Sequence, residues 1–198
     1  GIWVSTLDGR VLAVLAPQFL GIDMPYLDWS PDGLRIAFQG GGLQGYVYVT
    51  EVRDGALPMR LTSLPVDQAS PRWSPDGRQI AFVHGSWSAG FVNLMVMHGD
   101  GSGLRRIALP TVALNPRWSP DGRQIAFDNW SGVWVVNADG AGARPMTPGC
   151  LSDGQCDREI EIAFPQWSPD GRQLAAFTLR RTPLEEYRVD TIVQPGAE

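Results

Sequence analysis

The sequence contains no lysine, only two histidines and two cysteines, and no long apolar run. All 16 basic residues are arginine, so a phosphate-loop lysine, a Schiff-base lysine and a lysine general base are excluded. The longest apolar run, residues 11–16, is far shorter than the about 20 residues that a membrane-spanning helix needs. The net charge of -5 does not favour nucleic acid as a partner.

The few soft or imidazole ligands do not converge in the expected fold. His84 and His98 fall at opposite ends of neighbouring strands, about 20 Å apart, whereas a zinc ion needs four convergent groups. The acidic loop 153–161 lacks the Asp-x-Asp-x-Asp-Gly pattern of a calcium loop, which favours a solvated acidic loop. Neither a metal nor a cofactor is predicted.

Residues 85–90, Gly-Ser-Trp-Ser-Ala-Gly, resemble a nucleophile elbow. The elbow requires glycine two places before the nucleophile, and Ser86 stands there instead. The segment also falls in a predicted hairpin loop rather than between a strand and a helix. We therefore predict no catalytic residue and no enzyme activity.

Glycine (23 residues) and proline (16) are abundant, which favours many short strands joined by turns. A repeat organises them. The motif Trp-Ser-Pro-Asp-Gly, followed by an apolar strand, occurs four times with tryptophan spacings of 44, 45 and 49, at Trp29–Phe38, Trp73–Phe82, Trp118–Phe127 and Trp167–Phe177. The fourth copy carries Ala176 in place of phenylalanine, and Phe177 comes one place late, which suggests a bulge or an altered strand.

Each motif predicts a tight turn between two strands. Proline sets φ near −65°, aspartate caps the turn, and glycine takes the left-handed conformation. The motif residues are therefore expected to be structural: the tryptophans pack between sheets and the aspartates hold turns. These residues are Trp29, Trp73, Trp118, Trp167, Asp32, Asp76, Asp121 and Asp170.

The strand after each turn is apolar on successive residues, so both of its faces should be buried between stacked sheets. A third strand ending near Asp-Gly follows at residues 46–55, 91–101 and 132–140, and a short fourth strand comes next. Four antiparallel strands in about 45 residues make a propeller blade. The predicted fold class is all-β, a β-propeller of four-stranded antiparallel blades.

We expect one propeller domain over residues 1–198. Residues 1–9 match the third strand of a blade, so the N-terminal strands are expected to complete the last blade and close a four-bladed ring. A larger parent propeller, or a ring made by two copies, are the alternatives. The expected parts are closing strands in 1–17, blades in 26–63, 71–109 and 116–147, and a last blade in 165–198.

These residues resemble the TolB-type propeller repeat, which has WD-repeat-like blades marked by Pro-x-Trp-Ser-Pro-Asp-Gly. Residues 73–82 with 94–101, and 118–127 with 133–140, fit the pattern well. The resemblance implies a non-catalytic protein-interaction module that binds peptide segments of partners. Similar blades occur in the propellers of prolyl-oligopeptidase-like peptidases and in surface proteins, so a propeller that docks substrate for an enzyme, or a structural subunit of an extracellular assembly, are alternatives.

Cys150 and Cys156 lie in one expanded connection. We predict a disulfide between them, which implies an oxidising compartment. Together with the resemblance, this predicts an extracytoplasmic location: periplasmic, secreted or at the cell surface.

The motif turns and the Asp-Gly turns share one side of the predicted sheets and are uniform in length, whereas the loops on the opposite side vary. Variable loops on a rigid scaffold are the usual place for binding. We expect a protein or peptide partner, and association into a homo-oligomer or larger assembly stays open. The candidate contact residues on the variable side are Trp87, Trp130, His84, Asn129, Phe19, Tyr26, Arg180 and Arg181.

Overall fold

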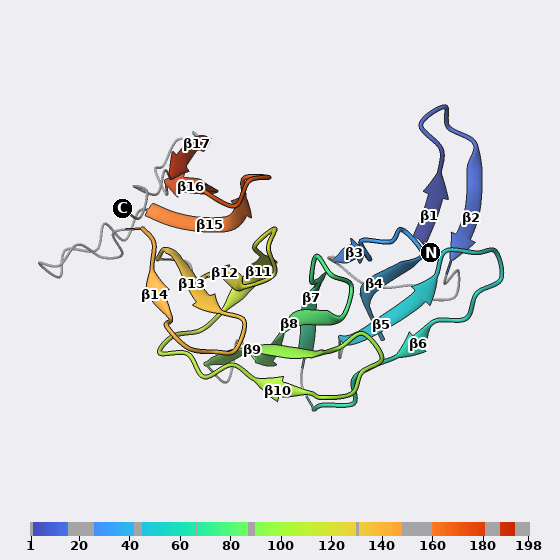
Figure 1. The fold of residues 1–198 in the computed structure, drawn as a ribbon, viewed down its shortest axis with the longest axis horizontal. Helices are drawn as coiled ribbons and strands as arrows, with labels where there is room; N and C mark the ends of the chain where they lie inside the picture. The colour runs from blue at the N-terminus through green and yellow to red at the C-terminus, as the bar shows by residue number, and fades with distance from the viewer. Residues whose placement is uncertain are drawn as a thin grey trace, which may run out of the picture. The chain divides into compact units, whose positions relative to one another are not determined.

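The computed structural model is built from short β-strands, and no helix occurs in the part that it describes (Figure 1). It follows that no described helix could span a bilayer. The chain forms two compact units, residues 1–91 with 95–105 and residues 92–94 with 106–198. The structure describes residues 2–15, 26–41, 45–65, 67–86, 90–129, 131–147, 160–180 and 187–192, of which 160–162, 178–180 and 187–192 are described by backbone alone.

The first unit begins with a two-stranded sheet, followed by two four-stranded sheets in the orders β3-β4-β5-β6 and β10-β9-β8-β7. Three residues of β9 group with the second unit. The strands are β1 (Ile2–Ser5), β2 (Val11–Leu15), β3 (Leu27–Trp29), β4 (Arg35–Gly40), β5 (Tyr46–Glu51), β6 (Met59–Arg60), β7 (Asp67–Trp73), β8 (Gln79–Ser86), β9 (Phe91–His98) and β10 (Arg105–Arg106).

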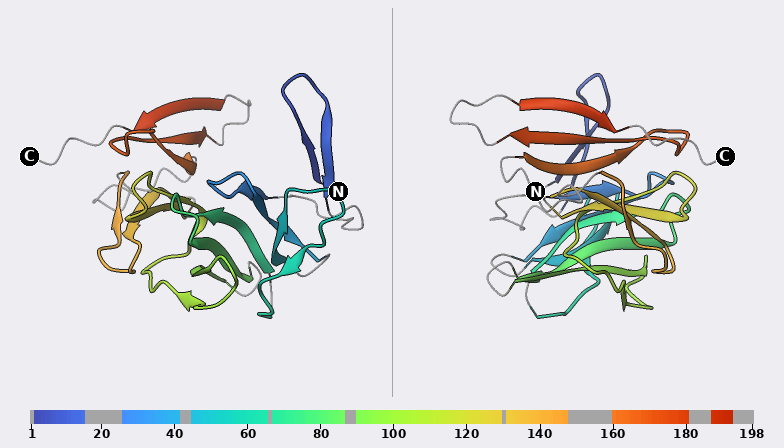
Figure 2. Two further views of the ribbon diagram at one scale, coloured as in Figure 1. Left: turned by 45° about the vertical axis from the view of Figure 1, so that its right-hand side comes forward. Right: turned by 90° about the vertical axis from the view of Figure 1, so that its left-hand side faces the viewer.

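The second unit holds a four-stranded sheet in the order β11-β12-β13-β14 and a three-stranded sheet, β15-β16-β17, whose strands lie side by side in Figure 2. Its strands are β11 (Leu114–Trp118), β12 (Gln124–Asp128), β13 (Val133–Asn137), β14 (Arg144–Pro145), β15 (Ile160–Trp167), β16 (Leu174–Arg180) and β17 (Tyr187–Ile192). The predicted all-β class of antiparallel four-stranded sheets is confirmed.

Each motif forms the predicted turn between the first and second strands of a sheet. The N–H of Gly77 donates to Ser74 O at 2.9 Å, which closes the four-residue turn. Gly77 has φ +70°, a conformation that glycine adopts without steric cost, and the other three motif glycines have φ of +70° or +71°.

The second strand of each four-stranded sheet is buried on both faces, as its unbroken apolar pattern predicts. In β8, the consecutive residues Ile80, Ala81 and Phe82 are all fully buried. The corresponding residues 36–38 of β4 and 125–127 of β12 are buried as well. Successive side chains of a strand point to opposite faces, so each of these strands lies between two packed layers.

The late phenylalanine of the fourth motif does not arise from a bulge of its own. The β15–β16 pair has a register shift between Ala163 and Gln166, but the same shift occurs in the β7–β8 and β11–β12 pairs. The register next to the turn is unchanged, since Trp167 faces Leu174. Ala176 therefore takes the buried phenylalanine position, and Phe177 points to the opposite face, where it is 46% exposed.

In the last sheet, β17 pairs with β16 and takes the place of a third strand. Among the described strands, β1 and β2 pair only with each other, in a sheet of their own. Pairing between the N-terminal and C-terminal strands, and with it closure of the ring, stays a prediction.

Candidate functional site

The side of the sheets that carries the motif turns, called here the turn side, is held by one repeated hydrogen-bond network. The Ser74 hydroxyl donates to Asp76 Oδ1 at 2.6 Å and accepts the N–H of Gln79 at 2.9 Å. Asp76 Oδ1 also accepts the N–H of Arg78 at 3.1 Å. The serine–aspartate bond recurs in the other three turns, between residues 30 and 32, 119 and 121, and 168 and 170.

The serine hydroxyl beside each motif aspartate holds the pKa of that carboxyl below its usual value, and backbone N–H groups add to this effect. The charged form is therefore the one that the turn binds. The turn at Asp100-Gly101 has a similar arrangement, because the Ser102 hydroxyl lowers the pKa of Asp100. A carboxylate that accepts hydrogen bonds within its own turn stabilises that turn, which supports the predicted capping role.

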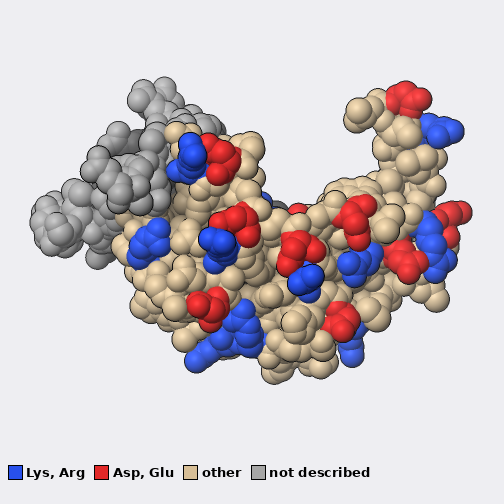
Figure 3. Space-filling model, viewed as in Figure 1, with Lys and Arg blue, Asp and Glu red and all other residues tan. Residues whose placement is uncertain are grey.

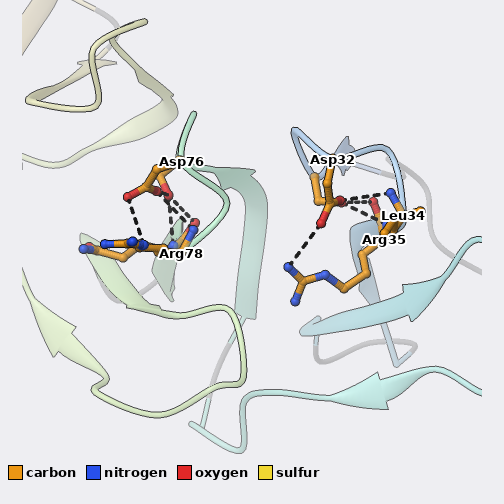
Figure 4. A network of polar contacts seen from close by, with 8 residues as sticks. Asp32, Leu34, Arg35, Asp76 and Arg78 are labelled. Atoms are coloured by element: carbon orange, nitrogen blue, oxygen red, sulfur yellow. Dashed lines mark hydrogen bonds and ion pairs between the residues drawn. The ribbon is translucent and has the colours of Figure 1, made fainter.

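Ion pairs complete the turn side. Arg78 Nε lies 4.0 Å from Asp76, and Arg35 Nη2 lies 3.9 Å from Asp32 (Figure 4). The Arg35 guanidinium also lies 4.5 Å from the ring centroid of Trp73, a cation–π contact between two neighbouring sheets. Acidic and basic side chains also lie beside one another on the face drawn in Figure 3.

At the opposite ends of the strands, called here the loop side, the first unit presents an aromatic cluster. The ring of His84, near the end of β8, lies 6.3 Å from the ring of Phe91, which begins β9. His84 Nε2 donates to Pro65 O at 2.8 Å. Phe91 is 39% exposed although it borders a largely buried strand. Tyr26 is half-buried, and its carbonyl accepts the N–H of Gln39.

In the second unit, Asp128 organises the loop side. Its carboxylate is fully buried, and Oδ2 accepts Asn115 Nδ2 at 2.9 Å and the N–H of Phe164 at 3.0 Å. The next residue, Asn129, is half-buried and donates from Nδ2 to Thr111 Oγ1 at 2.9 Å. Sequence reasoning found Asn129 but missed its neighbour Asp128, which ties two sheets together.

Among the residues that the structure describes, three that are not glycine have positive φ, and all three occupy the same place in successive first strands. Ser70, Asn115 and Phe164 have φ of 53°, 45° and 57°, and each precedes the proline of Pro-x-Trp. This conformation is unfavourable for such residues and is further restricted before proline. It coincides with the register shift in each strand pair. Strain that persists at equivalent positions is often tied to function, which draws attention to this end of the strands.

The four motif tryptophans differ in burial. Trp73 is 5% exposed, Trp118 and Trp167 are half-buried, and Trp29 is 44% exposed. The indole Nε1 of Trp167 donates to Arg117 O in the preceding sheet at 3.1 Å. The motif therefore sets the turn in every sheet, whereas burial of its tryptophan depends on the neighbouring sheet.

Several predicted residues lie outside the described part of the chain: Trp87, Trp130, Phe19, Arg181, Cys150 and Cys156. Only the backbone of Arg180 is described. Their contacts, and the predicted disulfide, stay predictions. Among the described candidates, His84 and Tyr26 lie in the first unit and Asn129 lies in the second.

The sequence also held signals for residues that were not selected. Phe164 precedes Pro-Gln-Trp where the second and third copies have serine and asparagine, and the late Phe177 was visible as a departure from the repeat. The rings of these two residues meet edge to face, 6.3 Å apart, and both are more than 40% exposed. Phe91 was overlooked because it begins a strand that was read only as a core element.

Repeated tight turns and packed four-stranded antiparallel sheets define the class of β-propeller proteins. Within this class, the chain belongs to the TolB beta propeller domain family, whose family model matches residues 4–177. TolB-type propellers are protein-interaction modules, and this is the level of function that membership supports.

Solved structures agree with this assignment. A TolB-type protein of Agrobacterium tumefaciens matches with a TM-score of 0.70 and 19% identity, covering 93% of this chain and 69% of that one. TolB of Acinetobacter baumannii matches with a TM-score of 0.63 and 18% identity, covering 96% and 45%. A prolyl endopeptidase matches with a TM-score of 0.57 and 12% identity, and the match covers 86% of this chain and 29% of the endopeptidase chain. At these identities the likeness shows the fold alone. Comparison with curated protein sequences gave no match.

Proposed function

We propose that this chain is a non-catalytic interaction module that binds a protein or peptide partner through its loop side. The residues proposed to contact the partner are Trp87, Trp130, His84, Asn129, Phe19, Tyr26, Arg180 and Arg181, with Phe91 added from the structure. Tryptophan and arginine are the residue types most enriched in binding hot spots.

The observation that carries this proposal is the contrast between the two sides of the sheets. On the turn side, motif carboxylates and hydroxyls bond within their own turns, so binding a partner there would break existing hydrogen bonds. On the loop side, the His84–Phe91 cluster exposes an aromatic ring beside a variable loop. A partner could bury that ring without disrupting the turns that hold the sheets.

A second candidate is a propeller that docks or gates substrate for an attached peptidase. The match to a prolyl endopeptidase favours it, and the chain covers 29% of that enzyme's length. This candidate requires a catalytic domain encoded with the propeller. Sequencing the reading frame on both sides of these residues discriminates the two, since only the peptidase candidate predicts such a domain there.

We propose an extracytoplasmic location, because the TolB resemblance implies it and a Cys150–Cys156 disulfide would require an oxidising compartment. Counting free thiols in denatured, non-reduced protein isolated from its native compartment tests this. The proposal predicts no free thiol. Two free thiols per chain would contradict both the disulfide and the location.

The binding side is tested with peptides selected on the immobilised chain from a random display library. The double variant Trp87→Ser/Trp130→Ser should lose at least about 2 kcal/mol of binding free energy, roughly 30-fold in Kd. The matched control is Arg78→Ser/Arg123→Ser, which changes two exposed turn-side residues. If the control abolishes binding and the tryptophan variant binds normally, the assignment of sides is wrong. Unchanged circular dichroism confirms that both variants fold.

A further inference from the structure

Two of the candidate contact residues, His84 and Asn129, occupy the same place in successive copies of the repeat. Each follows the motif tryptophan by eleven residues, at the loop-side end of the second strand. The sequence before them is identical in the two copies, from Pro71 to Phe82 and from Pro116 to Phe127, and it first differs at the two residues that follow. A contact that both residues make is therefore made by different side chains on the same scaffold.

In the first unit, the His84 side chain is bonded to the connection that enters its own sheet. The ring Nε2 donates to Pro65 O at 2.8 Å, and Pro65 lies two residues before β7 begins. A carbonyl oxygen can only accept, so this bond places the proton on Nε2. The same ring lies 6.3 Å from the ring of Phe91, the first residue of β9. His84 therefore joins the end of β8 to the segments on both sides of it.

In the second unit, the Asn129 side chain makes the equivalent bond. Its Nδ2 donates to Thr111 Oγ1 at 2.9 Å, and Thr111 lies in the connection that enters β11. Its Oδ1 accepts the Ser131 hydroxyl at 3.0 Å, and its backbone N–H donates to Gly132 O at 3.1 Å. Both ends of the Asn129 amide are thus bonded within the chain.

The bond from each of these side chains to the entering connection is called here a latch. In the second unit, the residue before the latch fixes the other face of the strand, because Asp128 accepts the N–H of Phe164 in the next sheet. Successive side chains of a strand point to opposite faces, so Asp128 and Asn129 hold the start of one loop from two sides. In the first copy the latch position is Gly40, which has no side chain to form such a bond.

We propose that His84 and Asn129 are positioning residues for the partner, because each latch holds a variable loop of the loop side in the conformation that binds. This inference rests on the proposed function of the loop side. A polar atom that is already bonded within the chain gains little from a partner, since the new bond replaces an existing one. A loop that is ordered before binding loses less conformational entropy when it binds. The latches therefore contribute through the loops that they order.

A positioning residue and a contact residue affect the rate constants of binding differently. When a latch is removed, the loop spends a smaller fraction of time in the binding conformation, and the apparent affinity falls by that fraction. The association rate constant falls with it, whereas the dissociation rate constant is unchanged. Loss of a residue that touches the partner acts mostly on dissociation. The two roles are therefore distinguishable by kinetics.

Thr111 allows the second-unit latch to be removed without changing a proposed contact residue. Thr111→Val removes the acceptor hydroxyl and keeps the branched shape, whereas Thr111→Ser keeps the hydroxyl and should rescue the latch. In the free chain, amide hydrogen exchange in residues 128–133 should be roughly 3- to 10-fold faster in Thr111→Val than in Thr111→Ser, the effect of one hydrogen bond. Equal exchange in the two variants would overturn the proposal without reference to any partner.

Binding is measured with a peptide from the display library whose affinity Trp87→Ser/Trp130→Ser weakens, so that loop-side binding is established first. Thr111→Val should raise Kd roughly 3- to 10-fold through slower association, and Thr111→Ser should restore it. The matched control Ser102→Ala removes a hydroxyl–carboxylate hydrogen bond from a turn on the turn side and should leave Kd unchanged.

An unchanged Kd in Thr111→Val would overturn the latch and leave the proposed function in place. A higher Kd that comes from faster dissociation would also overturn it, because that result indicates direct contact. If no peptide meets the selection criterion, the proposed function fails, and the exchange of the free chain alone decides the latch.

The first-unit latch is tested at its donor, because its acceptor is a backbone carbonyl. His84→Phe keeps a ring beside Phe91 and loses the N–H, whereas His84→Gln keeps an N–H donor of similar reach. Exchange in residues 83–86 should be faster in His84→Phe than in His84→Gln, and peptide association should be slower. Equal exchange and equal association in these two variants would overturn the role of His84.

Discussion

Two contacts within the first unit use the same motif and bury it to different extents. Between β3–β6 and β7–β10, Trp73 is 5% exposed. Between the two-stranded sheet and β3–β6, Trp29 stays 44% exposed. The turns that follow these tryptophans are alike, with the same serine–aspartate bond and the same glycine φ of +70°. Local sequence therefore determines the turn, and the neighbouring sheet determines whether the tryptophan becomes core.

The two tryptophans also differ in the contacts that the preceding sheet makes with them. Trp73 is covered by a four-stranded sheet, whose Asp28 carboxylate accepts the N–H of Trp73 at 2.7 Å and whose Arg35 lies over the ring. The sheet before Trp29 has two strands, and neither is a first or second strand of the motif type. A tryptophan buries 150–250 Å², so the difference in burial should be large in energy.

The largest effect on stability is expected at the contact between β3–β6 and β7–β10, where Trp73 is buried. Trp73→Ala should lower the free energy of unfolding by about 3–5 kcal/mol, because it leaves a cavity between two sheets. Trp29→Ala should cost about 1–2 kcal/mol, since nearly half of that side chain is already in water. Urea denaturation of both variants measures the difference. Equal losses would show that the preceding sheet does not set the burial.

The next largest effect is expected at the hydrogen bond that joins β3–β6 to β7–β10. Asp28→Ala removes the carboxylate that accepts the Trp73 N–H, and a hydrogen bond to a charged group contributes about 1.5–3 kcal/mol. The loss should appear in the urea midpoint of the first unit. The control Asp54→Ala changes an exposed aspartate in an Asp-Gly turn of the same sheet and should cost less. A control loss as large as that of Asp28→Ala would contradict a specific role for the bond.

Acid should weaken all four motif turns alike, whatever the state of the neighbouring sheet. The lowered pKa of Asp76 and its three counterparts means that their stabilising effect is complete above the usual aspartate value of 3.8. It is lost as the pH falls through the lowered pKa. Asp76→Asn/Asp121→Asn should therefore reduce the drop in urea midpoint between pH 7 and pH 3. If the drop in urea midpoint is as large as in the unchanged chain, other carboxyl groups cause the acid sensitivity.

The smallest effect is expected at Trp3. In dilute solution Trp3→Ser should change the free energy of unfolding by less than about 0.5 kcal/mol, because the side chain is mostly in water. Urea denaturation of the variant beside the unchanged chain tests this. A loss as large as that of Trp73→Ala would mean that Trp3 is covered.

Much of this fold can be read from the repeat. Trp-Ser-Pro-Asp-Gly specifies its turn through bonds within five residues, and the unbroken apolar run of residues 80–82 predicts a strand buried on both faces. The unequal burial of Trp29 and Trp73 could not be predicted, because it depends on which strands the preceding sheet contains. The positive φ of Ser70, Asn115 and Phe164 was equally hidden, since it accompanies a register shift that three different residue types share.

The candidate site was predicted only in outline. Uniform turns and variable loops identify the two sides of the sheets, because a turn that serves the fold alone keeps one length and one chemistry. His84 and Asn129 were selected by type and position, and both lie near variable loops. The exposed ring of Phe91 was missed, because a residue at the start of an apolar strand does not reveal on which side of the protein surface its ring will lie.

The most direct test of the central claim, that the loop side binds, is hydrogen–deuterium exchange of the chain with and without a peptide selected from the display library. Bound peptide should slow exchange in residues 83–92 and 128–133. Exchange in the motif turns at 30–35, 74–79, 119–124 and 168–173 should not change. Protection confined to these turns, with unchanged exchange in 83–92 and 128–133, would contradict the account.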